Sequence, residues 1–262
     1  MSRDGAPQDS LPPRGHVIIH GKDFTVCRSA SSPPLTVADL SNAAQYEELI
    51  ETVCCASEAY ARHIGPYLPR LKETLDFSFH FVDANIVTDP DVSIAAFYDE
   101  PCYRFFHWAP SKVPFSMEQV RTAYDYLHKV IKEHGPFDGV MGFSQGCVMS
   151  AALLQHHAKT HPEDPVDALF RFAILFSSPG WPPEDADGSI IPWGDLRVPS
   201  LHIIGQADEE WYEGGIIMYH EHCEEGTARL IEHEDGHSIP KDPPTVNKII
   251  EAIEELVQRA SA

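Results

Sequence analysis

The segment from residue 137 to residue 148 constrains the fold of this chain more than any other. It reads Phe-Asp-Gly-Val-Met-Gly-Phe-Ser-Gln-Gly-Cys-Val, which is typical of a short buried strand, a sharp turn and the start of a helix. Gly142, Ser144 and Gly146 have the Gly-x-Ser-x-Gly spacing of a nucleophile elbow. In an elbow the serine sits in a strained turn, and glycines let neighbouring chain come close. The pattern predicts a reactive Ser144 hydroxyl above a sheet; the alternative is an ordinary Gly-rich turn with a buried serine.

The sequence on both sides of the elbow favours the reactive alternative. Gly135-Pro136 is a helix stop before the strand, and an apolar helical run follows Cys147. A helix that begins directly after the serine points its positive end at the place where an oxyanion would develop.

Composition limits the classes to which the chain can belong. With 262 residues, 43% of them hydrophobic, the chain can bury one substantial core. We therefore expect one domain over residues 15–262, preceded by a flexible Pro-rich tail over 1–14. The formal net charge of −21 argues against nucleic acid and anionic membranes as partners, because both would repel the protein.

The cysteines and the N-terminus predict a cytoplasmic protein. The six cysteines show no metal-ligand spacing, and Cys54 and Cys55 are adjacent, which does not suit an ordinary disulfide. Free thiols indicate a reducing compartment. We also expect neither a signal peptide nor a membrane span, because the first residues contain no apolar region and no apolar run is long enough.

Strand-like and helix-like segments alternate along the chain, which predicts an α/β fold with a mostly parallel sheet and helices on both faces. The run over 170–177 is almost entirely apolar, as expected of a central parallel strand. A capping box at 116–119 opens one of the helices. The expected strands are 16–21, 77–82, 137–141, 170–177, 199–208 and 228–233. The expected helices are a stretch from 40 that ends near 65–66, a second piece through 75, and 116–135, 147–154, 214–223 and 246–257.

Two long segments between these elements are candidates for pocket or lid structure. Residues 84–114 are expected to be irregular and are rich in aromatic side chains, so they could form a pocket wall or a loop anchored in the core. Residues 179–196 are rich in Pro and Trp and read either as a lid or as a rigid surface loop.

An acid and a histidine follow later strands of the predicted sheet. Functional groups gather at the carboxyl ends of such strands, and Asp208 lies at the end of one of them. Glu209 and Glu210 are the alternatives for the acid. His237 follows the last strand, where a general base would stand, and His233 within that strand is the competing histidine. The order Ser, Asp, His is the order of an α/β-hydrolase triad.

The chain resembles the FSH family of serine hydrolases. The resemblance is carried by Gly-Pro-Phe-Asp-Gly-Val-Met-Gly-Phe-Ser-Gln-Gly over 135–146, by Phe-Ala-Ile-Leu over 172–175, by the run 198–208 and by His-Glu-Asp-Gly-His-Ser-Ile-Pro over 233–240. These motifs extend from about residue 77 to the end. The family includes the ovarian-cancer-associated serine hydrolase and thioesterases that release fungal polyketides.

The resemblance implies an α/β-hydrolase fold and a serine esterase or thioesterase with the triad Ser144, Asp208 and His237. The implied substrate is an ester or thioester of an apolar acyl group, such as a polyketide or fatty acyl chain, that an acyl carrier protein could present. No metal or organic cofactor is implied. The oxyanion donors would be the amides of Gln145 and Lys22, although the family's second glycine is missing after His20-Gly21. The alternatives are an acyltransferase or cyclase with the same triad, and a non-catalytic binding protein.

Overall fold

The computed structural model describes residues 15–19, 64–75, 77, 79–88, 102–107, 116–180 and 195–261, the first of these by its backbone only. The predicted tail over 1–14, Lys22 and much of the two candidate pocket or lid segments lie outside these residues. Statements on the fold below concern the described part of the chain.

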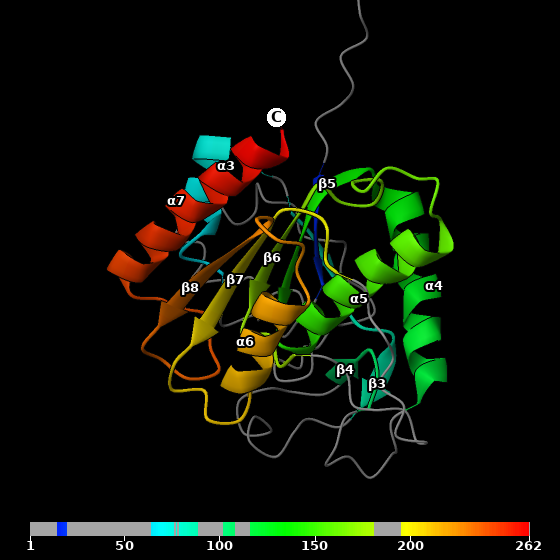
Figure 1. The fold of residues 1–262 in the computed structure, drawn as a ribbon, viewed down its shortest axis with the longest axis horizontal. Coiled ribbons are helices and arrows are strands. Elements are labelled where there is room, and N and C mark those ends of the chain that lie inside the picture. The colour runs from blue at the N-terminus through cyan, green and yellow to red at the C-terminus, as the bar shows by residue number, and fades with distance from the viewer. Residues whose placement is uncertain are drawn as a thin grey trace, which may run out of the picture.

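A six-stranded sheet forms the centre of the molecule, in the order β2-β1-β5-β6-β7-β8 (Figure 1). Every neighbouring pair in this sheet is parallel, so all strands end at the same edge. The strands are β1 (Gly15–Ile19), β2 (Phe79–Val82), β5 (Phe137–Phe143), β6 (Phe172–Phe176), β7 (Ser200–Gly205) and β8 (Ala228–His233).

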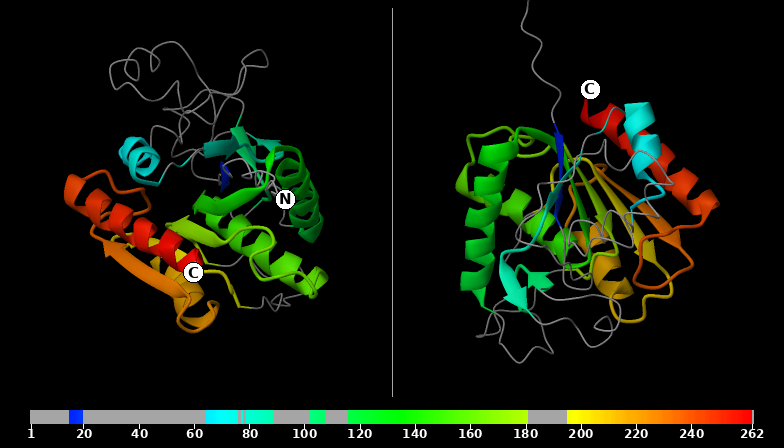
Figure 2. Two further views of the ribbon diagram at one scale, coloured as in Figure 1. Left: turned by 90° about the horizontal axis from the view of Figure 1, so that it is seen from above. Right: turned by 180° about the vertical axis from the view of Figure 1, so that it is seen from behind.

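Helices cover both faces of the sheet, as Figure 2 shows from above and from behind. Strand β6 is buried along its whole length, and its side chains alternate between two hydrophobic cores. Ala173 and Leu175 belong to the core with α4, α5 and α6, whereas Ile174 belongs to the core with α3 and α7. The helices are α3 (Leu68–Leu75), α4 (Met117–His134), α5 (Gln145–Thr160), α6 (Tyr212–Glu221) and α7 (Pro243–Ala260). The predicted α/β sheet with helices on both faces is confirmed.

The segment after β2 differs from the prediction of a long irregular loop. It contains two short strands, β3 (Ile86–Thr88) and β4 (Cys102–Arg104), which pair in antiparallel fashion. The aromatic residues that follow β4 distinguish between the two predicted alternatives, a pocket wall and a loop anchored in the core. Phe105 and Phe106 are fully buried in the core beside α4 and α5. At these two positions the loop is anchored in the core and does not form a pocket wall.

The start of α4 also differs from the predicted capping box. The Ser116 hydroxyl accepts a hydrogen bond from the N–H of Glu118 at 3.2 Å, so the serine does cap the helix. The Gln119 side chain is used elsewhere: its Oε1 accepts from the N–H of His107, and its Nε2 lies 3.0 Å from the His107 ring. The Gln119 side chain thus connects the segment after β4 to α4. Because its amide contacts His107, it is not used for the reciprocal hydrogen bond of a capping box.

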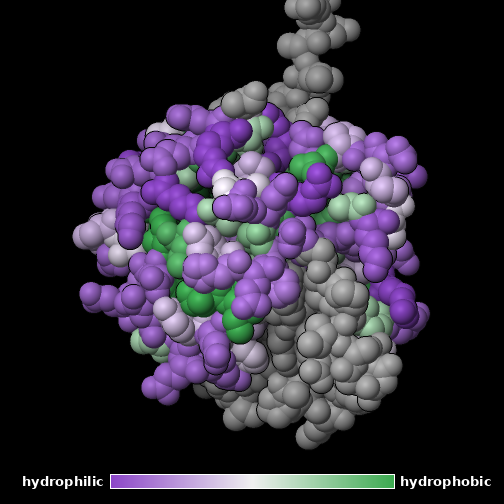
Figure 3. Space-filling model, in the orientation of Figure 1, coloured by the Kyte–Doolittle hydropathy of each residue, from purple (hydrophilic) through white to green (hydrophobic). Residues whose placement is uncertain are grey.

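The described surface that faces the viewer in Figure 3 is mostly hydrophilic. Large hydrophobic side chains that are exposed in the described residues are scattered along the chain, at Val87, Val166 and Ile217. None of the helices in these residues has the length and apolarity that a bilayer crossing requires.

Candidate active site

Ser144 lies in the sharp turn between β5 and α5, in the strained conformation that the elbow pattern predicts. Its φ is 51° and its ψ is −120°, a region that side-chain-bearing residues seldom adopt. A Cβ at Gly142 would lie 2.6 Å from the carbonyl carbon of Gly146, so only glycine permits the close approach of strand and helix. The carbonyl of Phe176 at the end of β6 accepts the Ser144 N–H at 3.0 Å and the Cys147 thiol at 3.0 Å. The elbow is therefore held to the neighbouring strand.

Asp208 lies in the turn between β7 and α6. The turn passes close to the loop after β8, because the position of a Cβ at Gly205 is already occupied by the carbonyl oxygens of Asp235 and Gly236. The Asp208 side chain is only 4% exposed, and its Oδ1 accepts the N–H of Trp211 at 3.1 Å. This bond leaves Oδ2 directed at a second partner.

His237 lies in the loop after β8 and contacts both of the other candidate residues. Its Nδ1 lies 2.6 Å from Asp208 Oδ2, and its Nε2 lies 2.9 Å from Ser144 Oγ. An ionised carboxylate can only accept, so we assign the ring proton to Nδ1, which leaves Nε2 as the acceptor for the serine hydroxyl. The ring also packs 5.1 Å from the ring of Phe143. The structure therefore joins the three predicted residues in one hydrogen-bonded chain.

The competing candidates do not take part in this chain. His233 is buried near the end of β8, and its ring nitrogens make no hydrogen bond within the described structure. Burial lowers the pKa of His233, so it stays neutral near pH 7. Glu209 and Glu210 are both exposed. Asp208 and His237 are thus the acid and the histidine that contact each other.

Gln145 has a role for its backbone N–H at the start of α5 and a separate role for its side chain, which binds the segment after β4. It is the first residue of α5, so its N–H has no partner within the helix and can donate to a ligand. Its side-chain Oε1 accepts the N–H of Phe105 at 2.9 Å, and its Nε2 donates to the carbonyl of Phe106 at 3.0 Å. Sequence reasoning missed this side-chain role, because nothing near Gln145 in the sequence indicates a contact 40 residues away. The other proposed oxyanion donor, Lys22, lies outside the described residues.

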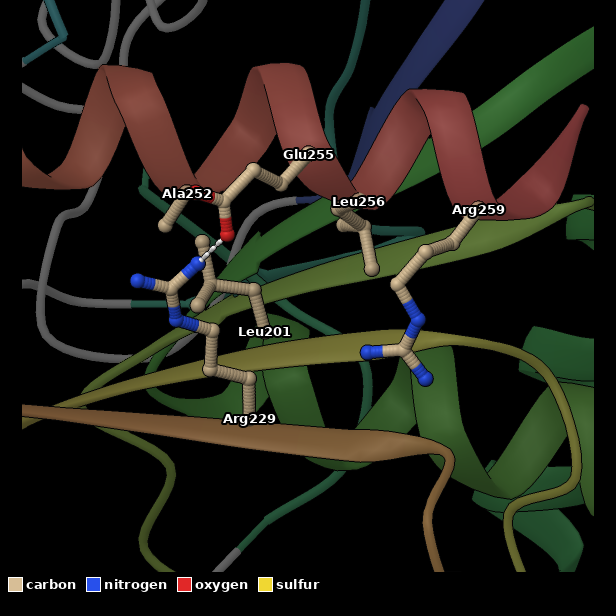
Figure 4. A pocket seen from close by; sticks show the side chains of 6 residues that line it. All are labelled: Leu201, Arg229, Ala252, Glu255, Leu256 and Arg259. Carbon is tan, nitrogen blue, oxygen red and sulfur yellow. Dashed lines mark hydrogen bonds and ion pairs between the residues drawn. The ribbon is translucent and has the colours of Figure 1, made fainter.

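A small pocket lies at the opposite edge of the sheet, between α7 and the first residues of β7 and β8 (Figure 4). Arg229 pairs with Glu255 across it, and Arg259 donates to the carbonyl of Gly226 at 2.7 Å. These side chains therefore already have partners, and the pocket is remote from the carboxyl edge where Ser144 lies. In the described residues, no group of His, Cys, Asp and Glu side chains is arranged to hold a metal ion.

Comparison with known proteins identifies the family of the chain. A family model described as serine hydrolase (FSH1) matches residues 56–249. Hydrolase phiM of Talaromyces stipitatus is 32% identical over 206 residues, which cover 72% of this chain and 80% of that protein. Esterase FPY3 of Fusarium mangiferae is 30% identical over 208 residues, which cover 73% and 87%.

A solved structure extends the comparison to the fold. A carboxylesterase from Mesorhizobium loti superposes with a TM-score of 0.51 at 15% identity, over 91% of this chain and 87% of that one. This likeness confirms the α/β-hydrolase fold that the sequence predicted. Since the family model covers more than half of the residues, the chain belongs to the serine hydrolase (FSH1) family.

Proposed function

We propose that the protein cleaves an ester or thioester of an apolar acyl group through an acyl-enzyme on Ser144. One observation carries the proposal: His237 lies within hydrogen-bond distance of both Ser144 Oγ, at 2.9 Å, and Asp208 Oδ2, at 2.6 Å. A base that contacts the nucleophile and is oriented by a buried acid is the arrangement that activates a serine.

In the proposed acylation step, His237 Nε2 takes the proton of the Ser144 hydroxyl while Oγ attacks the carbonyl carbon. Asp208 holds the Nδ1–H tautomer and stabilises the imidazolium that forms. The oxyanion accepts the N–H of Gln145 at the start of α5, and one such donor contributes about 3 kcal/mol to the transition state. The intermediate collapses when Nε2–H gives its proton to the departing alkoxide or thiolate.

In the proposed deacylation step, water takes the place of the leaving group. His237 Nε2 removes a proton from this water, whose oxygen attacks the acyl carbon. The bond to Ser144 Oγ breaks, Oγ recovers its proton from Nε2–H, and a carboxylic acid leaves. The step needs no cofactor, and an alcohol acceptor in place of water would give an ester product instead.

The names of the relatives support hydrolysis of an ester, and the aromatic sequence segments support an apolar acyl group. FPY3 is named an esterase and phiM a hydrolase. The sequence segment 84–114 is rich in aromatic side chains; the half-buried Tyr103 packs against the core with α4 and α5, while Phe97, Tyr98 and Trp108 lie outside the described residues. From this aromatic composition of the sequence we propose a polyketide or fatty acyl chain as the substrate, free or presented on an acyl carrier protein.

Labelling with a fluorophosphonate probe, followed by intact-mass measurement, tests the proposal. We expect one adduct on the wild type and none on Ser144→Ala. Ser200→Ala is the matched control, because its hydroxyl also lies beside a histidine, and it should label like the wild type. Failure of folded wild-type protein to label would overturn the proposal. Turnover of p-nitrophenyl esters and N-acetylcysteamine thioesters of increasing length, with and without added alcohol, then defines chain length, leaving group and acceptor.

Removal of the acid tests the assigned tautomer. Asp208→Asn should lower kcat by about 10⁴-fold, because an amide that donates to Nδ1 leaves the proton on the wrong ring nitrogen. Asp235→Asn is the control: this exposed carboxylate lies in the histidine loop, 3.8 Å from His233. If both variants retained the wild-type kcat, Asp208 would have no role in the reaction.

A further inference from the structure

Ser177, directly after β6, adopts a backbone conformation that its side chain disfavours. Its φ is 49°, in the left-handed region where glycine is the residue without steric cost. The residue is 1% exposed, so solvent does not explain a hydroxyl at this position. Residues other than glycine that keep such a strained backbone cluster at functional sites, so the Ser177 side chain is a candidate for a role there.

The hydroxyl of Ser177 is bonded to the loop that carries the histidine. Its Oγ donates to the carbonyl oxygen of Ser238 at 3.1 Å, and Ser238 is the residue next to His237. Its backbone is fixed as well, because the Ser177 N–H donates to the carbonyl of Ile203 in β7 at 2.7 Å. The donor, Ser177, is thus held by β6 and β7 of the sheet, while the acceptor, the Ser238 carbonyl, lies in a loop.

Ser144 and Ser177 form a matched pair at neighbouring strand ends. Phe143 and Phe176 are paired in the register of β5 and β6, and each is followed by a serine with positive φ. One serine presents its hydroxyl to the ring of His237, and the other holds the backbone of the same loop. The strained turn at Ser144 therefore positions the hydroxyl, and the strained turn at Ser177 positions the loop that carries His237.

We propose that Ser177 is a positioning residue that holds the loop of His237 so that the ring reaches Ser144 and Asp208 together. This inference rests on the proposed catalytic role of the three residues. Ser177 acts through His237 and does not touch the reacting atoms. A separate anchor keeps the rest of the loop in place, because the hydroxyl of Tyr67 donates to the carbonyl of Pro240 at 2.9 Å. Loss of the Ser177 hydroxyl should therefore loosen the histidine without unfolding the loop.

Two substitutions at Ser177 separate the hydroxyl from the backbone strain. Ser177→Ala removes the hydroxyl and keeps the strain, whereas Ser177→Gly removes both, so the glycine variant should have the higher melting temperature of the two. Ser178→Ala is the matched control. This neighbouring serine is equally buried, but its hydroxyl donates to the Met218 sulfur in α6 and not to the histidine loop.

The measured quantities are the phosphonylation rate and the affinity for the same probe. We expect Ser177→Ala and Ser177→Gly both to react about 10- to 100-fold more slowly at unchanged probe affinity, the scale of loss that a displacement of about 1 Å causes. Ser178→Ala should react like the wild type. The proposal would be overturned if the more stable Ser177→Gly reacted at the wild-type rate while Ser177→Ala did not. A wild-type rate in both Ser177 variants would overturn it as well.

A double-variant cycle identifies the residue through which Ser177 acts. The residual turnover of His237→Ala with an activated ester should be unchanged, within about twofold, when Ser177→Ala is added, because groups that act as one unit are not additive. The same 10- to 100-fold loss in both backgrounds would contradict the proposal. Labelling of the wild type is a separate result, so failure of the proposed hydrolase activity would be visible independently.

Discussion

In the described part of this molecule, two clusters place a serine beside a histidine, and one of the two has the features of a catalytic site. At the carboxyl edge of the sheet, His237 lies between Ser144 and Asp208, and its side chain is 18% exposed. Inside the sheet, His202 of β7 lies 3.1 Å from the Ser200 hydroxyl through its Nε2 and is completely buried.

The surroundings of the two histidines differ more than their distances. The second cluster has a thiol, Cys223, 3.4 Å from the His202 ring, and the other ring nitrogen, Nδ1, makes no hydrogen bond in the described residues. Burial lowers the pKa of His202 to about 4, so the ring stays neutral near pH 7 and is a much weaker base than an ordinary histidine. A serine–histidine contact becomes a candidate for catalysis through a carboxylate, access and a strained turn, and not through distance alone.

The largest expected difference between the clusters is in turnover. His237→Gln should lower kcat/KM for a p-nitrophenyl ester by about 10⁴-fold, because it removes the proposed base. The matched variant His202→Gln should stay within about threefold of the wild type at a temperature where circular dichroism shows both variants folded. A comparable loss in His202→Gln would show that the buried cluster contributes to the reaction.

The second difference is in acid stability. The folded chain binds a proton at His202 only near pH 4, whereas the unfolded chain binds it near pH 6.5. The unfolded state therefore holds more protons between these values, and the free energy of unfolding falls as the pH falls from 6.5 to 4. We expect a contribution of about 3 kcal/mol over this range, from 1.36 kcal/mol per pKa unit.

Urea unfolding from pH 7 to pH 4.5 measures this contribution as the difference between wild type and His202→Gln. The variant should lose stability less steeply, because its side chain does not titrate. Parallel curves for the two proteins would show that His202 takes up its proton at the same pH in both states.

The smallest expected effect concerns the Cys223 thiol of the buried cluster. Burial raises the pKa of the Cys223 thiol to about 11, so the thiolate fraction near pH 7.5 is about 100-fold below that of an ordinary cysteine. Iodoacetamide should therefore modify Cys223 about 100-fold more slowly in the native protein than in urea, as measured on its peptide by mass spectrometry. Rapid native alkylation would mean that the second cluster opens to solvent.

Much of the fold could be predicted where the signals are local. Strand β8 has the predicted bounds, and the fully apolar run before Ser177 forms the central strand β6. Chain order also separated His237 from the other histidines, because it is the one that follows the last strand.

The features that the sequence could not predict depend on partners distant in the chain. The strands β3 and β4 have three residues each, too few to show a period before they pair. Gln119 gave a capping signal, yet its amide binds His107 in the tertiary structure. The strain at Ser177 has no sequence signature, because the residue gains its left-handed backbone only when its neighbours are in place.

The separation of Ser144 and His237 by 93 positions has a consequence for the synthesis of this protein. A ribosome that has just translated the elbow still has to translate β6, β7 and β8 before the histidine exists, so the serine is made well before its proposed base. Fragments that end before residue 237 would carry an unactivated hydroxyl even with an intact elbow. Labelling of Ser144 in a cell extract would thus count molecules that have been translated and folded through the last strand, and would pass over incomplete chains.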